Sequence, residues 1–84
     1  MADKIAEIMK EMSQGMQVIA ITHLPQIASK GKVHFKVSKS DSETATTSHI
    51  TQLSKEERIQ ELAKMLSGSK ITEAAITNAK ELLA

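Results

Sequence analysis

Apolar residues near the start of the chain recur with the period of an α-helix. They fall three and four positions apart, so they share one face of an amphipathic helix. That face consists of Ile5, Ile8, Met9 and Met12. Gly15 follows, and a glycine beyond the last apolar position is typical of a helix end. The pattern predicts a helix from about Ala2 to Ser13.

A continuous apolar run of strand length comes next. The residues from Val18 to Ile21 are apolar without alternation, as in a strand that is buried on both faces. We therefore predict a strand over residues 16–22, which ends at His23. In open α/β sheets, ligands bind at the carboxyl ends of the strands, so a titratable side chain at this point is where chemistry is expected.

Pro25 and the residues after it predict a short helix and then a β-hairpin. A proline suits the first turn of a helix because its missing N–H costs nothing there, and this helix is predicted to end near Gly31. Residues 32–38 alternate between apolar and polar, which predicts a half-buried strand. Its apolar face holds Val33, Phe35 and Val37, and its polar face holds Lys32, His34 and Lys36. After a polar turn, residues 45–53 are predicted to form its antiparallel partner, with Ile50 as the main apolar residue.

Two helices with clear N-terminal signals end the chain. Ser54 and Glu57 have the spacing of a capping box, Gly68 is a good C-terminal stop, and Thr72 can cap the last helix. The inward faces are predicted to hold Ile59, Leu62, Ala63 and Leu66 in the first helix, and Ala75, Ile76, Ala79, Leu82 and Leu83 in the second. The predicted order is α, β, short α, β, β, α, α, an α/β fold in a single unit of residues 1–84.

Composition narrows this picture. A chain of 84 residues forms at most one small domain, and with no cysteine and 1% aromatic residues its core has few means of support. We therefore expect a piece of something larger. The net charge of +1 is too balanced to indicate a nucleic-acid or membrane partner by itself, and Arg58 is the one arginine. No apolar run approaches the roughly 20 residues of a membrane span, and the N-terminus has no signal-peptide pattern.

The histidines are the main candidates for chemistry. His34 and His49 lie on the polar faces of the predicted hairpin and could lie opposite each other as zinc ligands. No carboxylate or thiol converges on them, so two solvated surface histidines are the simpler interpretation. No glycine-rich phosphate loop is present, since the glycines are isolated.

His23 can be read as a structural histidine that caps a turn or as a side chain aimed at a ligand. Thr22 beside it could hydrogen-bond the same ligand or fill a slot that favours a β-branched residue.

One motif resembles a known family. Residues 21–28, Ile-Thr-His-Leu-Pro-Gln-Ile-Ala, closely resemble the segment after the Walker B strand in the RecN family of bacterial DNA repair proteins, an SMC-like branch of the ABC-type ATPases. Other ABC ATPases share the histidine but not usually the Leu-Pro-Gln after it. The resemblance continues over residues 33–39, 58–66 and 71–75, and residues 2–6 look like the helix after the family's D-loop. It covers nearly the whole chain.

The resemblance implies a fold and a site. The chain would be the C-terminal lobe of a P-loop NTPase head of the ABC/SMC type. His23 would be the switch (H-loop) histidine, which approaches the γ-phosphate of ATP, with Thr22 a weaker candidate for nucleotide binding. ATP and Mg²⁺ would be the cofactors of the full-length protein. Walker A, Walker B, the signature and the D-loop are absent here, so we expect the fragment alone to bind no nucleotide tightly and to be inactive.

The partners implied are the remainder of the same head, a second head in a homodimer, and DNA through the full-length protein. No membrane partner is implied, and the setting would be the bacterial cytoplasm in association with the nucleoid. The function would be DNA double-strand break repair and recombination. The alternative is a stand-alone α/β interaction module, in which the capped C-terminal helices present a partner surface and His23 is structural.

Overall fold

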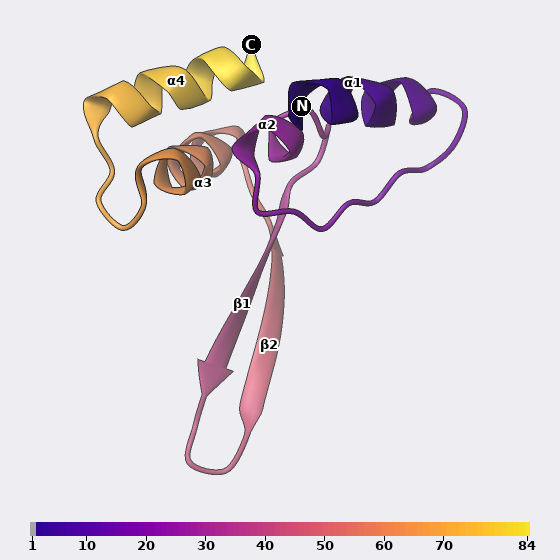
Figure 1. The fold of residues 1–84 in the computed structure, drawn as a ribbon. Helices are drawn as coiled ribbons and strands as arrows, with labels where there is room; N and C mark the ends of the chain where they lie inside the picture. Colours follow the sequence, from indigo (N-terminus) through magenta and orange to yellow (C-terminus); the bar gives the residue numbers. More distant parts are fainter. Residues whose placement is uncertain (1) are drawn as a thin grey trace.

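The computed structural model describes residues 2–84, which form helices and one two-stranded antiparallel sheet. The elements are α1 (Ala2–Met12), α2 (Pro25–Ala28), β1 (Phe35–Asp41), β2 (Thr46–Gln52), α3 (Lys55–Ser67) and α4 (Glu73–Leu83). Figure 1 shows α2 between α1 and the α3–α4 pair, with the β-hairpin projecting away from the helices. The predicted α/β class is confirmed, but the order lacks the first predicted strand. None of the helices in the described part has the length and hydropathy that a bilayer span requires.

Helices α3 and α4 form a helical hairpin whose ends are capped as predicted. The Ser54 hydroxyl accepts a hydrogen bond from the Glu57 N–H at 3.3 Å, and the Glu57 carboxylate accepts one from the Ser54 N–H at 2.9 Å. These two bonds complete a capping box and satisfy backbone donors that the helix itself leaves free. Gly68 ends α3 with a φ of 81°, a left-handed conformation that favours glycine. The Thr72 hydroxyl accepts from the Ala75 N–H at 3.1 Å and caps α4.

The core of the described residues lies between these two helices. Its buried members are Ile59, Leu62, Ala63, Ala75 and Ala79, with Ala28, Met65, Ile76 and Leu83 packed against them. Small alanines on both helices let the backbones approach closely around Leu62, which is fully buried. The predicted inward faces are confirmed except at Leu66, which is 37% exposed, and at Leu82, which is half-buried but is not packed against this core.

The predicted strand over residues 16–22 is wrong. In the structure this segment is irregular, and Ile19 and Ile21 are 82% and 102% exposed. A strand that is buried on both faces needs neighbouring strands to pair with and helices to cover it. The only strand pairing within residues 2–84 is that of β1 with β2, so the apolar run has no partner there.

The β-hairpin is confirmed, but its two faces are reversed. Strand β1 begins at Phe35 rather than at residue 32, and Val37 lies directly opposite Ile50. The apolar face is solvent-exposed, with Val37 at 63% and Ile50 at 71%. The polar face turns towards α3 instead, where Lys36 pairs with Glu61 at 2.9 Å. Alternation predicted the strand correctly, but it could not show which face the rest of the chain covers.

Helix α1 is also confirmed in its bounds but not in its packing. Ala6 is the buried residue of α1, and the helix packs against α2. Most of the predicted apolar face is uncovered, since Ile5, Ile8 and Met12 are 44%, 52% and 46% exposed. Like residues 16–22 and the outer face of the hairpin, this stripe has the composition of a buried surface and no cover among residues 2–84.

Candidate functional site

His23 lies in a short turn between the irregular segment and α2. The Thr22 hydroxyl accepts a hydrogen bond from the Leu24 N–H at 3.0 Å, which closes the turn around His23. Leu24 is extended, at φ −99° and ψ 120°, as expected of a residue that precedes proline. The His23 side chain is exposed, and no hydrogen bond to another part of residues 2–84 holds its ring. The turn therefore presents the imidazole to solvent.

Helix α2 fixes the position at which this turn ends. Pro25 is buried in the first turn of the helix, as predicted, and the Leu24 carbonyl accepts hydrogen bonds from the N–H groups of Ile27 and Ala28 at 3.1 and 3.0 Å. Ser29 is buried, and its hydroxyl donates to the Gln26 carbonyl at 3.2 Å. The helix is short and lies between α1 and α3, so its orientation depends on both neighbours.

The strongest link between α2 and the helical core is Arg58 of α3. Its guanidinium donates to the backbone carbonyls of the chain that leaves α2, at 2.8 Å to Gly31, 3.3 Å to Lys32, 3.3 Å to Ala28 and 3.5 Å to Ser29. Burial of the guanidinium lowers the pKa of Arg58 from its usual range, although an arginine stays charged in proteins. This cation therefore serves backbone oxygens rather than a carboxylate.

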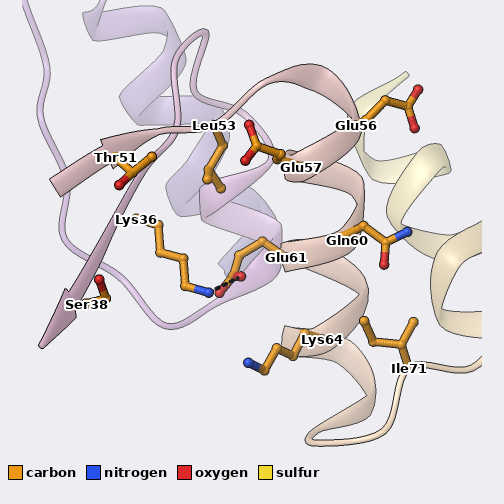
Figure 2. Close-up of a pocket in the computed structure, with 10 residues that line it drawn as sticks. All are labelled: Lys36, Ser38, Thr51, Leu53, Glu56, Glu57, Gln60, Glu61, Lys64 and Ile71. Carbon is orange, nitrogen blue, oxygen red and sulfur yellow. Dashed lines mark ion pairs between the residues drawn. The ribbon is translucent and has the colours of Figure 1, made fainter. Parts of the chain in front are cut away.

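Electrostatic contacts also join the hairpin to α3. Figure 2 shows the Lys36 ammonium meeting the Glu61 carboxylate across the space between β1 and α3. His34 lies on the same face of the hairpin, and its Nδ1 atom is buried without a hydrogen-bond partner. Burial lowers the pKa of His34, the charge of Arg58 lowers it further, and Glu61 opposes the shift. His34 is thus held towards its neutral form.

An open groove of about 540 Å³ separates this face of the hairpin from α3 (Figure 2). Most of the residues that line it are polar or charged, Lys36, Glu61 and Lys64 among them, while Leu53 and Ile71 add apolar surface. Neither His23 nor Thr22 lines it. The groove and the His23 turn are therefore separate features.

The predicted site residues fall into two groups. His23 and Thr22 share one turn, in which the Thr22 hydroxyl is an acceptor for the backbone and keeps its own proton free to donate. His34 and His49 do not lie opposite each other, because His49 pairs with Ser38 and His34 lies four positions further along, roughly 13 Å at the rise of a strand. The alternative of a facing pair is therefore wrong. The preferred interpretation, two solvated histidines, holds for the exposed His49, whereas His34 is half-buried. Within residues 2–84, no group of three or more His, Cys, Asp or Glu side chains is placed to hold a metal ion.

Sequence reasoning missed Arg58 as a residue of this region. Its contacts reach carbonyls between 26 and 30 positions away, and no local pattern encodes them. The one available signal was that Arg58 is the single arginine of the chain, placed on a helix rich in lysine and glutamate. Arginine carries a planar fork of donors that lysine lacks, so a single arginine on such a helix was the signal to follow.

Comparison with known proteins confirms the resemblance carried by residues 21–28. No family model matches the chain. The chain does match the C-terminal region of the DNA repair protein RecN from several bacteria. It is 49% identical to RecN of Rickettsia bellii over 98% of its length, 40% identical to RecN of Haemophilus influenzae over 98%, and 42% identical to RecN of Deinococcus radiodurans over 95%. It spans only 14–15% of the length of these relatives.

Proposed function

We propose that this chain contributes part of the nucleotide site of a RecN-type ATPase that acts in DNA double-strand break repair and recombination. In this proposal His23 is the switch residue that contacts the γ-phosphate of ATP. The observation that carries it is the exposed, unengaged ring of His23. It is presented by a turn that directly precedes the proline at the start of α2, in a chain 98% of whose length matches RecN.

The chemistry of His23 suits this role. An imidazole can donate a hydrogen bond to a terminal phosphate oxygen. Such a donor favours the state in which charge develops on the transferred phosphoryl group. The Thr22 hydroxyl, whose proton remains free, is placed to support the same ligand.

The rest of the site would come from elsewhere in the protein. The turn offers one imidazole and one hydroxyl, which fits one edge of a triphosphate but not a complete nucleotide site. Mg²⁺, when bound with ATP, would neutralise charge on the β- and γ-phosphates, and its ligands would lie outside this chain. We therefore expect the 84-residue chain alone to turn over no ATP.

Exposed apolar residues support a larger head around this chain. Ile19 and Ile21 belong to an apolar run that is typical of a buried strand, yet both are exposed to solvent. The Val37–Ile50 face of the hairpin is exposed as well. Neighbouring strands from the remainder of the same head would cover the first of these. The full-length protein would also have two partners: DNA, and a second head in a homodimer, which would complete the ATP site. It would act in the bacterial cytoplasm near the nucleoid. The alternative role of His23 as a turn cap lacks support, because its ring caps nothing in this turn.

The test is replacement of His23 in the full-length protein that contains this chain. We expect His23→Ala to lower kcat for ATP hydrolysis by about 10²-fold, the scale for loss of one transition-state donor, and to weaken ATP binding far less. His49→Ala, which removes an exposed histidine of β2, is the matched control and should leave both unchanged. A hydrolysis rate that is unchanged in folded His23→Ala would remove the switch role.

A further inference from the structure

Arg58 joins the helical core to the loop that leaves α2. Its Nη2 atom lies 2.8 Å from the Gly31 carbonyl oxygen and 3.3 Å from that of Ala28, while Nη1 lies 3.3 Å from the carbonyl oxygen of Lys32. These acceptors come from a single bend of the backbone, so one planar fork of donors holds the whole bend. The bond to the Ala28 carbonyl is partly buried, which limits its competition with water, whereas the bonds to Gly31 and Lys32 are exposed.

Helix α2 needs such an external support. The last carbonyls of any helix lack intrahelical partners, and a helix of a single turn is not stable by itself. The Ala28 carbonyl is one of these free acceptors, and Arg58 satisfies it. Arg58 is anchored in turn by α3, where the next residue, Ile59, is part of the buried core.

The same geometry connects Arg58 to His23. Only Leu24 separates His23 from Pro25, and α2 spans one helical turn from Pro25 to Ala28. Proline has a fixed φ, and the Thr22–Leu24 hydrogen bond closes the turn on the other side. A shift of the Ala28 end would therefore be transmitted through a short, stiff unit to the imidazole.

We infer that Arg58 is a positioning residue for His23: its guanidinium, bound to the carbonyls of residues 28–32, sets the orientation in which α2 presents the imidazole to a phosphate. This inference rests on the proposed function of His23. It assigns Arg58 to orientation and not to ATP binding, because both Nη atoms are engaged with backbone oxygens of this chain and the Nε atom is buried.

The first experiment is a double-mutant cycle on ATP hydrolysis in the full-length protein. Arg58→Met keeps an unbranched apolar stem and removes all donors, and we expect kcat to fall roughly tenfold or more, with little change in the KM for ATP. In the His23→Ala background, the same change should lower kcat no further, because Arg58 acts through His23. Arg58→Lys keeps the charge but not the fork, so its kcat should lie between those of wild type and Arg58→Met. Lys55→Met, on the exposed start of α3, is the control.

The second experiment reads the orientation itself in the 84-residue chain. The ring resonances of His23 in NMR spectra should shift in Arg58→Met, and the amides that follow α2 should exchange faster with solvent. The His49 ring, on the far hairpin, is the internal reference. Unchanged His23 resonances, or equal effects of Arg58→Met on kcat with and without His23, would overturn the inference. If His23→Ala alone leaves kcat unchanged while the resonances still shift, the proposed function fails and the structural link from Arg58 to the turn stands.

Discussion

The α3–α4 hairpin and the segment of residues 16–24 differ in how far their own residues satisfy their backbone hydrogen bonds and bury their apolar side chains. The helical hairpin caps both of its N-termini with its own side chains and buries Leu62 fully. The segment has the larger share of apolar residues, yet Ile21 is fully exposed and no regular structure forms. Apolar content therefore does not decide which region is ordered by this chain.

The difference lies in where the backbone hydrogen bonds are made. A helix closes its bonds within its own segment, so two helices and one contact face can form a stable unit. A strand must find its bonds on another segment, and a strand buried on both faces also needs two covering layers. A helical region can therefore be complete in a short chain, whereas a central strand depends on the parts of a protein that lie around it.

The largest expected effect is a contrast between two apolar truncations. In the 84-residue chain, Leu62→Ala should lower the free energy of unfolding by about 2–5 kcal/mol, because it opens a cavity in the only core that the described residues share. Ile21→Ser should change it by less than about 0.5 kcal/mol, as for a surface site. Urea unfolding followed by circular dichroism measures both. Since small domains have limited stability, Leu62→Ala should leave a visible fraction unfolded without urea.

The same pair in the full-length protein sharpens the contrast. If residues 16–22 become a buried strand there, Ile21→Ser should cost about as much as a core truncation, on the order of 2 kcal/mol or more. Hydrogen exchange at residues 18–21 should also slow relative to the 84-residue chain. A negligible effect of Ile21→Ser in both proteins would show that this segment is not completed by the rest of the molecule.

Local signals predicted most of the fold. The capping box at Ser54, the stop at Gly68 and the proline at the start of α2 were all read correctly, because each acts within a few residues of its own position. The strand over residues 16–22 and the covered face of the hairpin were read wrongly. Both depend on which other segments lie alongside, and periodicity carries no information on that point.

The candidate site divides in the same way. His23 could be selected from its place after an apolar run and from the Leu-Pro-Gln that follows it, and the structure places its ring in solvent. Arg58 could not be selected, since its partners are backbone carbonyls brought close only by the packing of α2 on α3. Side chains that act on distant backbone leave no motif in the sequence.

A smaller effect is expected from the helix caps, and its size shows how much they contribute to the stability of the helical hairpin. Ser54→Ala removes the hydroxyl that accepts from the Glu57 N–H, and it should lower the free energy of unfolding by about 1 kcal/mol. Ser69→Ala, in the exposed turn between α3 and α4, is the matched control and should be close to neutral. Urea midpoints of the two variants give the comparison. Equal midpoints would mean that tertiary packing alone determines where α3 begins.

The smallest effect concerns the contact between the β-hairpin and α3. This contact joins the exposed β-hairpin to the helical core. Burial and the nearby charge of Arg58 hold the pKa of His34 below its usual value of 6.5. The unfolded chain therefore binds a proton at His34 before the folded chain does, so stability should fall as the pH drops below about 6.5 and should be independent of this group above it. His34→Gln should flatten that slope below about pH 6.5, whereas His49→Gln, at an exposed position, should leave it unchanged. If the slope survives His34→Gln, then proton binding at His34 does not couple the hairpin to α3, and the Lys36–Glu61 pair is the contact to remove next.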